Sequence, residues 1–401
     1  MNKKLFIALS IIIILLFILI FLSIDNTDLN LPKTKWFKMF KNDKNEEGYY
    51  VASTRDGGCI VLGYTESTYD ENQDIYLIKI DKNGTKEWDI TYGQNGSDFG
   101  KAIVELDDGY MIAGSSNSQG KEEYDYNAWI IRTDIYGKMI WNNTYGGIFE
   151  DGSNSIVKTK ENNFVITGYT YSNKNKNIDL WIFKINETGN LIWSKTFGGK
   201  GYDEGRSVIE TNDGYIIAGE TNTYSNNEEY SDAWLLKVNK TGNQMWNYTF
   251  GRQYNDLFNQ IIKSDNRFFM VGHVQNKIEN EIYDEYYSKG YIVITDENGK
   301  ILYERIIEEG KETSLSSVEK IDNGFLTTGY IGPYGAGEGK ILVERIDNLG
   351  NRVWLKIYQG KNGDAGIWID KGINNNYFVT GYITDKNSNF KDLLIMKICN
   401  N

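Results

Sequence analysis

The chain has 401 residues, of which 40% are hydrophobic and 14% aromatic, and its formal net charge is −12. Such an acidic protein repels phosphate backbones, so the composition argues against nucleic-acid binding. Because the whole chain contains one histidine, His273, catalytic triads and histidine-rich metal sites are nearly excluded.

The N-terminus carries an apolar segment long enough to cross a bilayer. Residues 5–24 contain no charge, Lys3 and Lys4 precede them, and Asp25 and Asp28 follow. This pattern predicts a single-pass signal anchor in the cell membrane, with residues 1–4 in the cytoplasm and residues 25–33 as an outer linker. The alternative is a secreted chain with a cleaved signal peptide. The apolar run is longer than usual for such a peptide, and no clear cleavage site follows it.

One unit of about fifty residues recurs from Lys33 to the last residue. A glycine marks every copy, at intervals of 51 to 57 residues: Gly63, Gly114, Gly168, Gly219, Gly272, Gly329 and Gly381. An aromatic residue marks a second position: Trp36, Trp88, Trp141, Trp193, Trp246, Tyr303 and Trp354. A fixed period of this length indicates a propeller, a solenoid or an array.

Each copy reads as four short strands. Between Asp203 and Gly251, DEGRSVIET and YIIAGETN flank an NDG turn, and DAWLLKV and QMWNYTF flank an NKTGN turn. The runs YIIAG and WLLKV are apolar on consecutive residues, as expected for strands covered on both faces. The blades of a propeller cover one another in this way.

The tryptophan lies in the fourth strand, after a turn that begins with Asp or Asn and ends with Gly. Six copies carry this turn: Asp81–Gly84, Asp134–Gly137, Asn186–Gly189, Asn239–Gly242, Asp296–Gly299 and Asp347–Gly350. The arrangement resembles the tryptophan-docking propellers of the quinoprotein family, and it is similar to the DxWLxKxD…GNxxW repeats of secreted archaeal and bacterial surface proteins. The resemblance covers nearly the whole chain after residue 33. It implies a β-propeller but no particular function, because propellers host many unrelated activities.

The two ends of the repeat region complete each other. Residues 34–40 form a fourth strand with no unit before it, and the last copy ends after its third strand, KDLLIMKIC. Pairing residues 34–40 with residues 391–399 leaves no open edge between the first and last blades. We therefore predict an all-β, seven-bladed propeller over residues 34–401, with four-stranded blades and three-plus-one closure by the N-terminal strand.

Two cysteines occur, Cys59 and Cys399. An even number outside the cell invites a disulfide. The repeat places these two in different strands of adjacent units, farther apart than the roughly 7 Å that a disulfide bridges. We expect two free thiols.

The linker determines which face of the propeller looks outward. The strand at residues 34–40 begins where the tight turns lie, and residues 25–33 span at most roughly 30 Å when extended. The tight-turn face should therefore look toward the membrane. The long loops, which are polar, rich in tyrosine and mostly acidic, should look outward and recognise any partner.

Asn-x-Ser/Thr sequons occur at Asn83, Asn95, Asn142, Asn186, Asn239 and Asn247. All except Asn95 fall on the tight-turn face or the outer strands, so glycans on these five would leave the outward face clear. An Asn- and Thr-rich chain also produces sequons by chance.

An acidic residue usually begins the first strand of a copy: Glu47, Asp98, Asp151, Asp203, Asp256 and Asp364, with Thr313 in the sixth copy. Carboxylates around one mouth of the channel would suit a hard cation such as Ca²⁺. Alternatively, each carboxylate caps its turn and holds backbone amides of the next loop. Regular repetition favours the structural role, because a functional site normally departs from its repeat. A second column begins the third strand: Asp74, Asn127, Asp179, Asp232 and Asp392, with Lys289 and Lys340 in the fifth and sixth copies.

Departures from the repeat gather in the fifth and sixth copies, where a tyrosine replaces the tryptophan and two lysines replace acids. Trp368, in an inner strand near the channel, could stack on a ligand, but packing between blades is the favoured interpretation. The candidate partner-binding residues are His273, Lys289, Tyr303, Lys340 and Trp368. Drift in a redundant repeat would produce the same picture.

These observations predict a membrane-anchored extracytoplasmic propeller that binds an extracellular protein or glycan and catalyses no reaction. No catalytic constellation stands apart from the repeat positions. Two alternatives stay open: a scaffold subunit of a surface or secretion assembly, and a quinoprotein-type dehydrogenase, which the resemblance alone implies. No cofactor is expected, apart from Ca²⁺ if the acidic column binds it.

Overall fold

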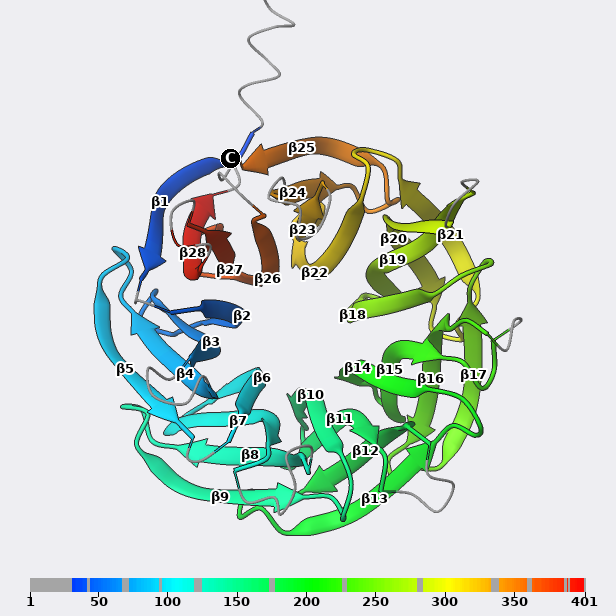
Figure 1. The fold of residues 1–401 in the computed structure, drawn as a ribbon, viewed down its shortest axis with the longest axis horizontal. Coiled ribbons are helices and arrows are strands. Elements are labelled where there is room, and N and C mark those ends of the chain that lie inside the picture. The colour runs from blue at the N-terminus through cyan, green and yellow to red at the C-terminus, as the bar shows by residue number, and fades with distance from the viewer. Residues whose placement is uncertain are drawn as a thin grey trace, which may run out of the picture.

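The computed structural model describes residues 31–399, except for residues 42–43, 67–71, 94–95, 119–124, 173–176, 226–228, 280–283, 333–338, 359–362, 386–387 and 389. Seven antiparallel four-stranded sheets form a ring around a central channel (Figure 1). The predicted seven-bladed all-β propeller is confirmed.

The strands of each blade follow one another from the channel to the rim. Blades 1 and 2 consist of β2 (Glu46–Ser53), β3 (Cys59–Glu66), β4 (Gln73–Ile80), β5 (Lys86–Tyr92), β6 (Asp98–Leu106), β7 (Gly109–Ser116), β8 (Asn127–Thr133) and β9 (Met139–Tyr145). Blades 3 and 4 consist of β10 (Asp151–Lys158), β11 (Phe164–Thr170), β12 (Asp179–Ile185), β13 (Leu191–Phe197), β14 (Asp203–Glu210), β15 (Gly214–Thr221), β16 (Asp232–Asn239) and β17 (Gln244–Phe250). Blades 5 and 6 consist of β18 (Asp256–Ser264), β19 (Arg267–Glu279), β20 (Asp284–Asp296), β21 (Ile301–Ile307), β22 (Thr313–Ile321), β23 (Gly324–Ile331), β24 (Lys340–Ile346) and β25 (Arg352–Tyr358).

The seventh blade joins the two ends of the chain. It consists of β26 (Ala365–Lys371), β27 (Asn376–Thr384), β28 (Lys391–Cys399) and, at the rim, β1 (Lys33–Phe40). β1 runs antiparallel to β28, with Lys33 opposite Cys399 and Phe40 opposite Leu393. The predicted three-plus-one closure is therefore confirmed, and the ring has no open sheet edge between its first and last blades.

The connections divide the propeller into two faces. The turns between the first and second strands of a blade, and between the third and fourth, are short and lie together on what we call the tight-turn face. The other connections lie on the opposite, long-loop face. β1 begins on the tight-turn face, because each fourth strand starts there.

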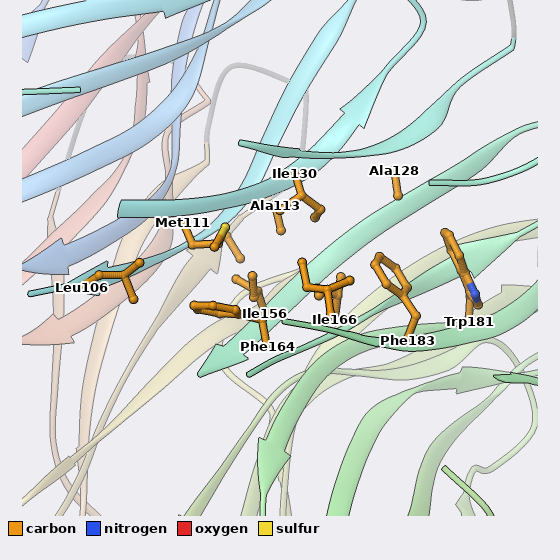
Figure 2. Packing of buried hydrophobic residues seen from close by; sticks show 12 residues of the cluster. Leu106, Met111, Ala113, Ala128, Ile130, Ile156, Phe164, Ile166, Trp181 and Phe183 are labelled. Atoms are coloured by element: carbon orange, nitrogen blue, oxygen red, sulfur yellow. The ribbon is translucent and has the colours of Figure 1, made fainter. Parts of the chain in front are cut away.

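Middle strands are buried on both sides because neighbouring blades cover them. Every residue of β7 and β15 is buried. Both strands accordingly read as nearly continuous apolar runs rather than as alternating patterns, as expected for strands covered on both faces. Figure 2 shows one such layer, in which Met111 and Ile130 of blade 2 pack with Ile166 and Phe183 of blade 3. The core is thus a set of layers between blades.

The outer-strand aromatic of one blade packs against the tight-turn glycine of the next. A Cβ atom added to Gly137 would lie 2.8 Å from the ring of Trp88, and one added to Gly299 would lie 3.3 Å from the ring of Trp246. The same contact joins Trp36 to Gly84, Trp141 to Gly189, Trp193 to Gly242 and Tyr303 to Gly350. These glycines also have φ values between +78° and +92°, which disfavour any other residue. The glycine therefore supplies both the turn and the space for the ring.

The structure also locates the thiols and bears on membrane segments. Cys59 is a buried free thiol whose pKa is raised by burial, and Cys399 lies in β28 of the adjoining blade. Across the described part of the chain, none of the helices is both long and apolar enough to cross a membrane. The predicted anchor at residues 5–24 lies outside the described residues.

Replacing Gly137 with alanine should lower the free energy of unfolding by about 1–3 kcal/mol, because the new Cβ meets Trp88 at a positive φ. Chemical denaturation of the purified chain measures this change. Gly290→Ala is the control, since Gly290 has no positive φ and its Cβ would come no closer than 3.2 Å to a neighbouring side chain. Equal effects of the two substitutions would contradict the docking of the ring on the turn.

Trp36→Ala should destabilise the whole propeller by about 2–4 kcal/mol, because Trp36 packs on the first blade and donates a hydrogen bond to Lys82 O at 3.2 Å. Phe37→Ala should change little, since Phe37 is 40% exposed on the same strand. Thermal unfolding followed by circular dichroism compares the two variants. A Trp36→Ala protein that melts like the parent would contradict closure by β1.

Candidate functional site

Each inner strand contains a β-bulge at the same repeat position. Pairing with the second strand skips one residue in every blade, for example Lys101 between Gly100 and Ala102, and Arg206 between Gly205 and Ser207. A bulge turns its extra side chain out of the regular alternation of a strand. The seven extra residues are Tyr49, Lys101, Asn154, Arg206, Asn259, Ser316 and Ile367.

All seven bulge residues line one hollow of about 640 Å³ in the central channel. The other lining residues are Glu150, Tyr169, Ile178, Tyr202, Glu204 and Trp368. Several of them immediately precede strands that start on the long-loop face, so the hollow opens at that mouth of the channel. It is larger than two grooves of about 390 and 450 Å³ that lie between blades near the tight turns. We call it the channel-mouth pocket.

A polar network holds one side of the pocket in place. Glu204 accepts hydrogen bonds from Tyr202 Oη at 2.7 Å and from Asn154 Nδ2 at 2.7 Å. Arg206 forms ion pairs with Glu204 at 2.9 Å and with Glu220 at 2.7 Å. Because each group is held by several partners, the donors and acceptors facing the channel are fixed before any ligand arrives.

Lys101 is the other cation of the pocket. Its Nζ lies 4.0 Å from the centre of the Tyr49 ring and 5.5 Å from that of Phe99. Burial lowers the pKa of Lys101, and the nearby carboxylates of Glu47 and Glu204 oppose that shift. Aromatic faces stabilise an ammonium group in such a setting.

The remaining wall is aromatic and amide-bearing. Trp368 stacks on Tyr50 with ring centres 4.1 Å apart, and Tyr169 donates a hydrogen bond to Glu150 at 2.9 Å. Trp368 thus packs between blades and also lines the pocket. Of the thirteen described residues around the pocket, none is a histidine or a cysteine. The wall therefore offers hydrogen-bonding groups and ring faces.

The acidic column at the inner-strand starts fastens loops. Asp256 accepts hydrogen bonds from Arg252 N at 2.6 Å and from Gln275 N at 2.9 Å, which ties the crossing from blade 4 to β19. The prediction was wrong for blade 1, where Glu46 and not Glu47 occupies the column position: Glu46 lies opposite Thr65, as Asp203 lies opposite Thr221. Glu46 accepts a hydrogen bond from Thr65 Oγ1 at 3.3 Å. The other members make comparable bonds to Ser118 (Asp98), Gly147 and Thr170 (Asp151), Thr221 and Thr223 (Asp203), and Thr384 (Asp364). Among the described residues, no three His, Cys, Asp or Glu side chains gather in a way that could hold a metal ion. The observed contacts are those of the loop-anchor interpretation.

The two acidic columns meet at the blade junctions. A Cβ added to Gly198 would lie 2.4 Å from Asp179 Oδ1 of blade 3 and 2.5 Å from Asp203 Oδ2 of blade 4. Burial and the charge of Asp203 raise the pKa of Asp179 to about 6. Burial also raises the pKa of Asp256 to about 7 and that of Asp364 to about 6. Each of these carboxyl groups therefore keeps its proton to a higher pH than an ordinary aspartate does.

The candidate partner-binding residues of blades 5 and 6 are not brought together. Tyr303 docks on a tight turn, whereas Lys289 donates hydrogen bonds to Glu308 O and Gly310 O on the long-loop face. The ring of His273 lies 3.1 Å from Ser314 Oγ, and burial lowers its pKa to about 4. Lys340 begins β24, and Trp368 alone of the five lines the pocket.

The sequon asparagines lie where the repeat predicts. Asn83, Asn186 and Asn239 are in tight turns, and Asn142 and Asn247 are on outer strands. Asn186 Oδ1 accepts hydrogen bonds from Thr188 N at 3.1 Å and Asn190 N at 2.8 Å, so it holds its own turn. Asn239 does the same. Asn95 lies outside the described residues.

Comparisons with known proteins identify the fold and no family. No family model matches the chain, and no curated protein matches it. Among solved structures, the polysaccharide lyase Uly1 is similar over 92% of this chain and 100% of its own, with TM-score 0.56 and 8% identity. The Neurospora crassa Pan2 WD40 domain is similar over 92% of this chain and 97% of its own, with TM-score 0.53 and 7% identity. Drosophila Plexin A in complex with Semaphorin 1b is similar over 93% of this chain and 88% of its own, with TM-score 0.51 and 8% identity. At such identities the likeness shows the β-propeller alone, and it includes an enzyme as well as interaction modules.

The contribution of three buried carboxyl groups to the unfolding free energy should fall as the pH rises from about 4 to about 7, whereas buried His273, whose pKa is lowered, contributes in the opposite direction. Folded Asp179, Asp256 and Asp364 hold protons more tightly than the unfolded chain, so their stabilisation is complete below the ordinary carboxyl pKa of about 3.9 and is lost above it. Asp179→Asn should therefore raise stability at pH 7.5, on the order of 1–3 kcal/mol, and not at pH 4. Asn127 occupies this position beside Asp151 in blade 2.

Denaturation at both pH values measures the effect. The matched control is Asp392→Asn, which removes an acid of the same column that is paired with Lys41 at 2.7 Å. It should lower stability at pH 7.5. An Asp179→Asn protein that is less stable than the parent at pH 7.5 would contradict the raised pKa of Asp179.

Proposed function

We propose that this chain is a membrane-anchored, extracytoplasmic binding module that holds one or two sugar residues of a glycan in the channel-mouth pocket. The observation that carries the proposal is the set of seven bulges. They place seven side chains of six different kinds at one repeat position, around one hollow. A site normally departs from its repeat in this way, whereas packing positions keep to it.

The chemistry of the wall suits a sugar. Hydroxyl groups both donate and accept hydrogen bonds, and the wall provides carboxylate acceptors on Glu150 and Glu204 beside the guanidinium donors of Arg206. Asn154 adds its amide oxygen as an acceptor, because its amide nitrogen already donates to Glu204 and to Gly205 O. The ring faces of Trp368 and its neighbours suit the apolar face of a pyranose. The hollow, at about 640 Å³, lies within the usual range for small-ligand sites.

The anchor and the pocket fit one arrangement. The segment predicted to cross the membrane precedes β1, which begins on the tight-turn face, whereas the pocket opens on the long-loop face. Anchored in this way, the chain presents the pocket away from the cell surface. A protein carrying the glycan then reaches the pocket without passing the bilayer.

Screening the full-length chain in detergent against an oligosaccharide array, followed by calorimetry on the hits, tests the proposal. Lys101→Met keeps the length of the side chain but removes its charge, and should weaken binding about tenfold or more. Lys160→Met, on an exposed tight turn, is the matched control and should bind as the parent does. Absence of any glycan binding by the folded chain, or equal binding by both variants, would overturn the proposal.

A further inference from the structure

The first residues of the outer strands differ from blade to blade in a systematic way. In blades 2 to 6, at least one of the two positions before the docking aromatic carries a large exposed apolar side chain: Ile140, Leu191, Ile192, Met245, Ile301, Leu302 and Val353. Met139 is half-buried, and Gln244 and Arg352 are polar. Blades 7 and 1 carry Thr34, Lys35, Lys86 and Glu87 at the same positions, all exposed. The repeat therefore does not require apolar residues here, and five consecutive blades nevertheless have them.

The neighbouring tight turns extend this surface. Ile135 and Tyr136 in the turn of blade 2 are 48% and 67% exposed, and Leu349 in the turn of blade 6 is 63% exposed. We call these residues, together with the outer-strand positions of blades 2 to 6, the apolar rim. It follows the circumference of the propeller on the tight-turn face.

We propose that the apolar rim lies against the headgroup and acyl boundary of the bilayer that holds the N-terminal anchor. The inference relies on the anchor included in the proposed function and is independent of the glycan. Residues 25–33 bridge at most roughly 30 Å between the predicted span and β1, which begins on this same face. The bilayer is therefore the surface that the rim meets at the highest effective concentration.

The form of the rim favours a lipid surface over a compact partner. Its outer-strand side chains are spread singly or in pairs over five blades, which suits a flat and fluid surface. Of the three tight-turn residues in the apolar rim, Tyr136 is the most exposed, and tyrosine is enriched at membrane–water interfaces. Lys35, on the blade nearest the anchor, suits the phosphate layer, whereas Lys86 on the next blade is paired with Asp89 at 3.1 Å.

Contact with the bilayer has a consequence for glycosylation. Asn186 lies five residues before Leu191, and Asn239 lies six before Met245, in the same turns and strand starts. A glycan on either asparagine would hold the rim away from the lipid. The proposal therefore requires Asn186 and Asn239 to be unmodified in the native chain, although their sequons are intact.

The test uses the full-length chain in nanodiscs of phosphatidylcholine and phosphatidylglycerol that contain a lipid with a nitroxide on its acyl chain. Ile192→Cys and Tyr224→Cys are each labelled with an environment-sensitive dye in a Cys399→Ser background, since Cys59 is buried. Tyr224 is 43% exposed on the long-loop face and serves as the matched position. We expect quenching at position 192 and none at position 224.

Equal quenching at both positions, or quenching at position 224 only, would overturn the proposal. Absence of quenching at position 192 in chains that co-purify with the discs would also overturn it, including the case in which two copies bury their rims together. A chain that fails to insert into the discs would overturn the anchor itself, whereas glycan binding is measured separately in detergent. Mass spectrometry showing glycans on Asn186 or Asn239 of the native chain would equally contradict the contact.

Discussion

The contact between an outer-strand aromatic ring and the tight-turn glycine of the next blade sets the geometry of this protein. It occurs at six of the seven junctions, with tryptophan in five of them and Tyr303 in the sixth. Each ring fills space that any Cβ would occupy, so every blade fixes the position of the following turn. At the remaining junction, Leu31 packs in the cluster that contains Trp354, and Lys356 donates a hydrogen bond to Pro32 O at 2.8 Å. Residues 31–32, just before β1, thus occupy the place that a tight turn takes at the other junctions.

The docked aromatic rings of the outer strands leave the bulge positions of the inner strands free to vary in sequence. Buried layers between blades and the docked rings determine where each blade lies, whereas the bulge side chains face the channel and contribute little to those layers. Lys101, Arg206 and Ile367 can therefore occupy the same repeat position without disturbing the fold. The carboxylates at the start of the same inner strands, in contrast, keep to the repeat, and they fasten the loops that cross between blades. Stability and the proposed glycan recognition thus depend on different positions of one repeat.

The sequence predicted the fold well because its strongest signals are local and periodic. Trp88 and Gly137 recur at fixed spacing, and the incomplete last copy pointed to closure by residues 34–40. The pocket could not be predicted in the same way, since a bulge depends on backbone pairing that skips one residue, such as Lys101. The signal was nevertheless present as one variable position inside a constant pattern. Likewise, both acidic columns were visible, but only the crossing between blades shows that Asp179 meets Asp203.

A crystal structure of the chain with the oligosaccharide it binds would test the central claim most directly. The account predicts sugar density at the long-loop mouth of the channel, within hydrogen-bonding distance of Asn154 and Arg206 and against the ring of Trp368. Density on the outer loops or between blades, with the channel-mouth pocket empty, would contradict it.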